Sequence, residues 1–102
     1  MASSSTVVQK EDRLEGSSNF HVWKMRITNI LQEQQLLHFI NSEPERPTSI
    51  VGGAAFDRNQ AKARRIIFDS VKDNVLGVMT VAMTPKQCMD SLSSLYEKSA
   101  TN

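Results

Sequence analysis

Three side chains of this 102-residue chain, besides its carboxylates, are the first candidates for a nucleophile, a general base or a metal ligand: Cys88, the one cysteine, and the two histidines His21 and His38. A cysteine nucleophile needs a polar, electropositive setting that lowers its pKa. Cys88 instead shares one face of an expected helix with Met89 and Leu92, a pattern typical of a buried thiol. Neither histidine stands at a metal-ligand spacing from Cys88, and the carboxylates form no acid–base pair. The sequence therefore predicts no enzyme activity, no metal site and no cofactor.

Composition and charge argue against several other kinds of site. Gly52-Gly53 is followed by Ala54-Ala55-Phe56, not by the lysine and hydroxyl residue of a phosphate-binding loop. The 12 basic and 11 acidic side chains leave a formal charge of +1, whereas a dedicated polyanion binder carries a basic excess. No apolar run approaches the roughly 20 residues that span a bilayer, and the N-terminus lacks the apolar core of a secretory signal. We therefore expect a cytoplasmic protein without a membrane or small-molecule partner.

Hydrophobic periodicity predicts helices along much of the chain. Between residues 20 and about 34, apolar side chains recur every third or fourth position and form one stripe. This stripe consists of Phe20, Trp23, Ile27, Ile30 and Leu31. A short apolar segment at 36–40 is expected to pack back on this helix. Two further helices are expected at 57–71, with Asp57 as its cap, and at 73–83, where the apolar arc is widest.

The clearest helix boundary is Thr84-Pro85-Lys86-Gln87. Threonine can cap, proline suits the first helical position, and glutamine can complete a capping box, so the last helix is expected to begin here. Between residues 41 and 57, by contrast, Pro44, Pro47 and the glycine pair interrupt any helical pattern and predict a long loop.

These elements together predict the fold class and the organisation of the chain. No alternating apolar pattern is long enough to indicate a strand. We expect an all-α protein, a compact bundle of four to five helices with a long loop at about 41–57. Residues 1–17 are polar and turn-prone and are interpreted as a mobile N-terminal arm. Residues 18–98 then form the helical domain, and residues 99–102 a frayed C-terminus.

Four basic side chains recur on one side of the expected 57–71 helix and its continuation. They are Arg58, Lys62, Arg65 and Lys72. Such a stripe is either a solvated helix face or a contact surface for RNA or an acidic partner. Asp69 lies within the same stripe, and exposed aromatic side chains that could stack on bases are missing, so the RNA interpretation is the weaker one.

Val22 and Met25 lie opposite the apolar stripe of the first helix. Either this helix is buried on two sides, or the two side chains belong to a protein–protein contact in a larger assembly. The sequence leaves both alternatives open.

The order of motifs in the chain resembles a known family. Leu14 through Arg26, LEGSSNFHVWKMR, is similar to the start of the gag polypeptide of copia-type LTR retrotransposons, with its leucine, small turn, Asn-Phe and Trp-Lys. Asp57 through Ala61, Thr84 through Leu92 and Leu95-Tyr96 resemble later helices of that family, so the likeness extends over residues 14–98.

The resemblance implies a structural, non-enzymatic capsid-type assembly module that self-associates into virus-like particles packaging RNA. Its partners would be further copies of itself or full-length gag, and assembled protein would be particle-associated in the cytoplasm. RNA contact would be indirect or weak, because the zinc knuckle that binds RNA in such polypeptides is not among these residues. The alternative is a truncated or domesticated gag-derived interaction module that binds a cellular partner or interferes with gag assembly. The residues that carry over as fold-defining are Phe20, Trp23, Ile27, Leu92 and Tyr96.

Overall fold

The computed structural model describes residues 8–97, and within this range it contains helices but no strand. The all-α prediction is therefore confirmed. Its five α-helices are α1 (Phe20–Glu33), α2 (His38–Asn41), α3 (Ile50–Asp69), α4 (Asp73–Leu76) and α5 (Pro85–Tyr96), and two short 3₁₀ helices lie at Lys10–Asp12 and Ser17–Asn19. None of the helices in this range is both long and apolar enough to cross a membrane.

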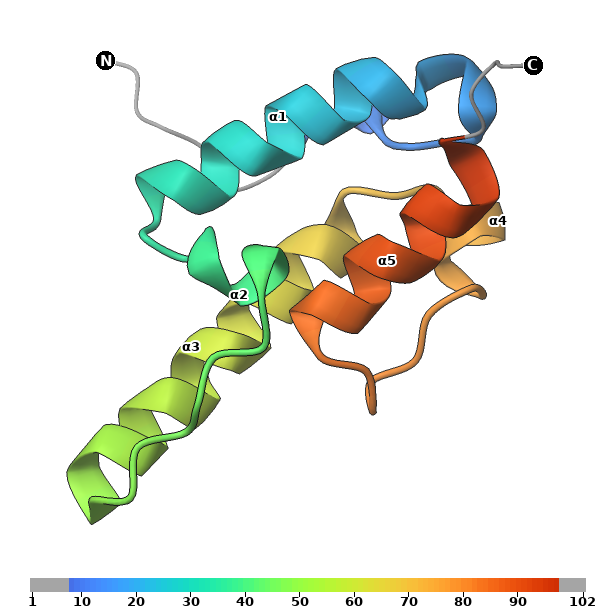
Figure 1. Cartoon of the computed structure of the whole chain (residues 1–102). Coiled ribbons are helices and arrows are strands. Elements are labelled where there is room, and N and C mark those ends of the chain that lie inside the picture. Colours follow the sequence, from blue (N-terminus) through green and yellow to red (C-terminus); the bar gives the residue numbers. More distant parts are fainter. Residues whose placement is uncertain (1–7, 98–102) are drawn as a thin grey trace.

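The helices pack in two levels (Figure 1). α1 lies across one side of the molecule, and the second half of α3 and all of α5 lie beneath it. α3 contacts both α1 and α5, and the short α2 closes the arrangement by packing against α5. The first half of α3 projects away from this body, with residues 42–49 running back along it.

α1 forms because its apolar residues recur at helical spacing and all face the same core. Its buried side chains are Phe20, Trp23, Ile27 and Leu31. After the helix, Gln35 adopts a left-handed conformation with φ of 62°, and the amide of Leu36 donates to the carbonyl of Leu31 at 2.7 Å. This is the hydrogen bond of a Schellman-type helix end. It turns the chain so that Leu36 and Phe39 also enter the core.

α3 begins seven residues before its predicted start, so the predicted 41–57 loop is wrong in its second half. Ser49 caps the helix, and its Oγ accepts a hydrogen bond from the amide of Gly52 at 3.0 Å. Gly52 and Gly53 are helical residues rather than turn residues. A Cβ at Gly53 would lie 2.8 Å from the guanidinium of Arg46, so this glycine permits a close approach of residues 42–49 to the helix. Asp57, predicted to be the cap, lies inside the helix.

The predicted 73–83 helix is also wrong in extent, because α4 ends at Leu76. The following residues form separate turns in which amides bond to carbonyls three positions earlier, as Val78 does to Val75 at 3.0 Å. The Thr80 hydroxyl accepts from the amide of Ala82 at 3.3 Å, a local bond that competes with helix continuation. Val75 in α4 and Met79 after it are both buried, so the apolar arc continues although the helix has ended.

α5 begins where the sequence predicts it. The Thr84 hydroxyl accepts from the amide of Gln87 at 3.1 Å, and the Gln87 side chain accepts from the amide of Thr84 at 2.9 Å. Pro85 occupies the first turn, where its missing amide hydrogen is not needed. Thr84 Oγ1 also donates to Glu43 at 2.8 Å, which ties the start of the 42–49 segment to this helix end.

Residues 8–17 belong to the folded body, which corrects the prediction of an arm over 1–17. Val8 and Leu14 are buried, and Leu14 is fully so. The amide of Leu14 donates to the Ser70 carbonyl at 3.0 Å, and the amide of Lys72 donates to the Leu14 carbonyl at 2.9 Å. Burying one leucine contributes about 1.5–3 kcal/mol, and the burial of Val8 and the two backbone hydrogen bonds add to it. Residues 1–7 and the predicted frayed end at 99–102 lie outside the described residues.

Ser70 joins this segment to α1. The Trp23 indole Nε1 donates to both the carbonyl oxygen and the hydroxyl of Ser70, at 2.9 and 3.1 Å. The Ser70 hydroxyl in turn donates to the carbonyl of Ile67 at 2.7 Å. Trp23 and Ser70 are both fully buried, so these bonds satisfy polar groups that would otherwise be costly to remove from water.

Candidate interaction surfaces

The outer face of α1 presents Val22 and Met25 to solvent, with 51% and 62% of their surfaces exposed. The helix is therefore buried on one side only, and of the two alternatives that the sequence left open, burial on a second side is excluded. Met25 lines a shallow pocket of about 500 Å³ whose other walls are polar. The ion pair between Lys24 and Glu97, 3.6 Å apart, bridges α1 to the end of α5 beside it.

A second pair of exposed apolar side chains lies at the projecting start of α3. Ile50 is 91% and Val51 is 81% exposed. Sequence reasoning missed this pair because it placed both residues in a loop. The signal that could have identified it was the serine at position 49 directly before two β-branched residues, since a serine there can cap a helix. We call Ile50 and Val51 the α3 tip.

Arg46 holds the 42–49 segment against the first half of α3. Its Nε donates to Asp57 Oδ1 at 3.0 Å and its Nη2 to Asp57 Oδ2 at 2.9 Å, a two-pronged pairing of guanidinium and carboxylate. These hydrogen bonds raise the pKa of Arg46 and lower the pKa of Asp57. The guanidinium lies over the bare backbone of Gly53, one turn before Asp57.

The structure does not gather all four residues of the predicted basic stripe in one place. Arg58, Lys62 and Arg65 are exposed along α3, and Arg65 pairs with Asp69 at 3.5 Å. α3 ends at Asp69, so Lys72 follows in an extended conformation and leaves the stripe. Its ammonium instead contacts Glu15 at 3.1 Å.

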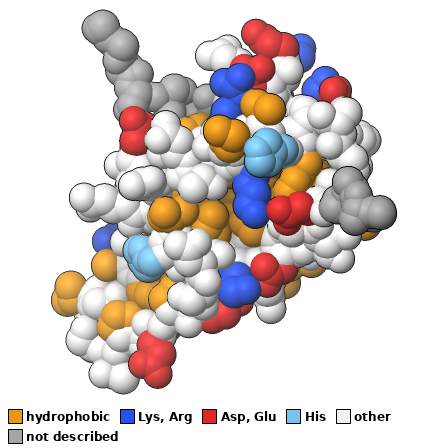
Figure 2. Space-filling model, turned by 45° about the horizontal axis from the view of Figure 1, so that its top comes forward, with side chains coloured by type: hydrophobic (Ala, Val, Ile, Leu, Met, Phe, Trp, Pro, Cys, Tyr) orange, Lys and Arg blue, Asp and Glu red, His pale blue; other side chains and the backbone are white. Residues whose placement is uncertain are grey.

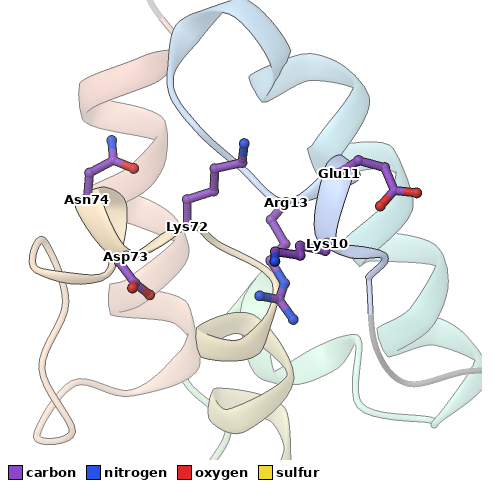
Figure 3. Close-up of a pocket in the computed structure, with 6 residues that line it drawn as sticks. All are labelled: Lys10, Glu11, Arg13, Lys72, Asp73 and Asn74. Atoms are coloured by element: carbon purple, nitrogen blue, oxygen red, sulfur yellow. The ribbon is translucent and has the colours of Figure 1, made fainter.

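Lys72 lines a pocket together with residues of the N-terminal segment (Figure 3). The pocket has a volume of about 470 Å³ and is lined by Lys10, Glu11, Arg13, Lys72, Asp73 and Asn74. Sequence reasoning missed it because Lys10 and Arg13 stood in the predicted arm. The pairing of Leu14 with Val71 and the ion pair of Glu15 with Lys72 bring the two stretches of chain side by side.

Cys88 lies on α5, and its side chain is fully buried. Removal from water raises the pKa of its thiol to about 11, and the positive charge of Arg64 opposes this shift only in part. A neutral thiol without access to solvent is a poor nucleophile. Within residues 8–97, no three His, Cys, Asp or Glu side chains lie close enough together to hold a metal ion.

The residues taken over as fold-defining lie in or against the core. Phe20, Trp23, Ile27 and Leu92 are buried, and Tyr96 packs against them while partly exposed. The rings of Phe20 and Trp23 are 5.6 Å apart between centroids, and those of Phe20 and Tyr96 are 6.5 Å apart. These contacts join the start of α1 to the end of α5.

The surface crossed by α1 shows hydrophobic side chains in separate patches between charged and polar ones, rather than in one broad apolar area (Figure 2). Comparison of the chain with protein-family models, with curated proteins and with solved structures finds no match of any of the three kinds.

Proposed function

We propose that this chain is a non-enzymatic assembly module, similar in role to the N-terminal capsid part of a copia-type gag, which self-associates into particles around RNA. The observation that carries the proposal is the presence of two exposed apolar pairs on different helices. One is Val22 with Met25 on the outer face of α1, and the other is the α3 tip.

The positions of these pairs suit repeated association. The α3 tip and the first half of α1 lie at opposite ends of the molecule (Figure 1). A contact between two different patches does not close on itself in pairs, so each copy can bind one neighbour at each end and the assembly can grow. Two side chains per patch cover far less than the about 800 Å² per partner of a standard stable interface, so each contact is weak. Growth then depends on concentration.

Sedimentation velocity and light scattering across a concentration series test this mechanism. The face variant carries Val22→Asp with Met25→Asp, and the tip variant carries Ile50→Asp with Val51→Asp. We expect the unmodified chain to form growing assemblies, and each variant alone to remain monomeric. A mixture of the two variants should stop at a dimer, because the intact tip of one binds the intact face of the other.

The matched control is Asn59→Asp with Ala61→Asp, which adds the same charge at exposed positions of α3 outside both pairs. We expect this control to assemble as the unmodified chain does. Assembly of the tip variant on its own would show a like-with-like contact through α1 and contradict the tip-to-face mechanism. An unmodified chain that stays monomeric at every concentration, even under crowding, would overturn the assembly function.

Sedimentation velocity and light scattering also distinguish the alternative function from assembly. A gag-derived interaction module would remain monomeric alone, yet would bind full-length gag and limit the size of its particles, or would bind a cellular protein. Adding the chain to assembling full-length gag therefore distinguishes the two. A building block enters particles that keep growing, whereas an interfering module reduces their mean mass in proportion to the amount added.

A further inference from the structure

The pocket between the N-terminal segment and α4 gathers positive charge from two distant parts of the sequence. Lys10 and Arg13 come from the N-terminal segment, and Lys72 comes from the connection between α3 and α4. The backbone hydrogen bonds between Leu14 and its neighbours Ser70 and Lys72 hold these two stretches together. The buried Leu14 therefore fixes the two walls of the pocket relative to one another.

Arg13 lines this pocket and is only partly buried. Its Nε is enclosed by the chain and has no acceptor, the one side-chain nitrogen or oxygen atom in residues 8–97 in this condition. Buried polar groups are almost always paired, so the chain itself does not fully match this guanidinium, and a ligand in the pocket would meet its terminal nitrogens. A guanidinium is best matched by a carboxylate or phosphate, whose oxygens can accept two parallel hydrogen bonds.

The charges around Arg13 favour an anion. Lys10 and Arg13 lie beside one another in the pocket (Figure 3), and neither forms an ion pair with a carboxylate of the described residues. The Glu11 side chain is directed away from both. Asp73 lies on the other wall, and there its carboxylate would repel an anion and limit the affinity. The ammonium of Lys72 forms an ion pair with Glu15.

We propose that this pocket binds a phosphate group, held by Arg13 and Lys10 with Lys72 on the opposite wall. The cavity of about 470 Å³ leaves room for the group that the phosphate carries, either a further phosphate or a nucleoside. The site is separate from both exposed apolar pairs. A negative result for phosphate binding would therefore not contradict assembly, and a negative result for assembly would not contradict phosphate binding. The phosphate could belong to a free polyphosphate ion or to a nucleic-acid backbone, and both offer the same oxygens to Arg13.

Titration of the ¹⁵N-labelled full chain with inorganic pyrophosphate, at constant ionic strength set by sodium chloride, tests the proposal. We expect saturable shifts confined to the amides of residues 10–14 and 72–74. Loss of a hydrogen bond to a charged group should weaken binding about tenfold or more in Arg13→Gln. Asp73→Asn should tighten binding instead, because it removes the repelling carboxylate. A short single-stranded RNA in a second titration identifies the source: shifts of the same amides that pyrophosphate reverses indicate a backbone phosphate.

Arg65→Gln is the matched control, because it removes the same charge from an exposed position of α3. It should leave the pyrophosphate affinity within about twofold of the unmodified value, as surface charges at a distance are screened. Equal weakening by Arg65→Gln and Arg13→Gln would reveal general charge attraction and overturn the site, as would shifts that never saturate. If Arg13→Gln does not fold, Lys10→Gln replaces it, since Lys10 is exposed, and unchanged affinity in that variant also contradicts the proposal.

Discussion

The two ends of α3 contain similar apolar residues but lie in opposite environments. At the C-terminal end, Ala63, Ile66 and Ile67 are buried. At the N-terminal end, Ile50 and Val51 are almost fully exposed. The C-terminal end is covered by α1, α5 and the segment around Leu14, whereas among residues 8–97 only the 42–49 segment runs beside the N-terminal end.

This difference shows that the interactions holding the two ends are of different kinds. The buried end is held by apolar packing and by the fully enclosed hydrogen bonds of Trp23 and Ser70. The projecting end is held by an exposed ion pair between Arg46 and Asp57, and exposed pairs contribute little to stability. Substitutions at the buried end should therefore change the free energy of unfolding, and those at the projecting end should change association.

The largest expected effect is that of Trp23→Ala. It removes a fully buried indole and the hydrogen bonds that it donates to Ser70, so the free energy of unfolding should fall by about 3–5 kcal/mol. Urea denaturation followed by circular dichroism measures this loss. Val22→Ala, the neighbouring exposed position, should change it by no more than about 0.5 kcal/mol. Similar values for the two variants would contradict the assigned burial of α1.

Leu14→Ala tests whether the N-terminal segment belongs to the buried end. Leu14 is fully enclosed and its backbone pairs with residues 70 and 72, so we expect a loss of about 2–5 kcal/mol in the same experiment. Ser18→Ala, at an exposed position directly after this segment, is the control and should be close to neutral. If Leu14→Ala left the free energy of unfolding unchanged, residues 8–17 would be a detached arm after all.

Acid should release the projecting end before it unfolds the buried one. The folded-state pKa of Asp57 is lowered, so its pairing with Arg46 stabilises the segment fully above the ordinary carboxyl value of 3.8. This contribution disappears as the pH falls through the lowered pKa. We expect faster amide hydrogen exchange in residues 42–49 over that range, corrected for intrinsic rates. Asp57→Asn should show fast exchange at every pH, and unchanged exchange in that variant would exclude the ion pair as the holding contact.

The smallest expected effect on stability is that of Ile50→Ser combined with Val51→Ser. Both side chains are exposed, so the free energy of unfolding of the monomer should change by no more than about 0.5 kcal/mol per substitution. Concentration-dependent assembly should nevertheless be lost. A large loss of stability without a change in association would show that the tip packs against its own chain, and the contrast between the two ends of α3 would no longer hold.

α1 and α5 could be predicted from the sequence because their signals are local. The spacing of Phe20, Trp23 and Ile27 predicts a one-sided helix at any position in a fold, and Thr84 with Pro85 and Gln87 satisfies the first amides of a helix within the same turn. These two elements needed no information about the rest of the molecule.

The start of α3 was missed because the glycine pair outweighed the local signal of Ser49, and the reason for these glycines lies in a side chain outside the helix. Glycine disfavours the middle of an isolated helix, so Gly52 and Gly53 indicated a loop. In the structure the absence of a side chain at Gly53 admits the Arg46 guanidinium, whose pairing with Asp57 lies on the next turn. Residues 73–83 show the opposite error. The apolar side chains of α4 and of the turns that follow it have helical spacing, so the sequence predicted one longer helix.

The sequence by itself determined that the chain is helical, which face of α1 is buried and where α5 begins, because hydrophobic spacing and capping act within a few neighbouring residues. Only the tertiary structure decided that Ile50 and Val51 project into solvent, that Leu14 enters the core, and that Lys10 and Arg13 meet Lys72 around one pocket. The last two arrangements depend on contacts between residues more than 50 positions apart, such as the pairing of Leu14 with Val71, and the first depends on the pairing of Arg46 with Asp57. Patterns within a few neighbouring residues do not predict such contacts.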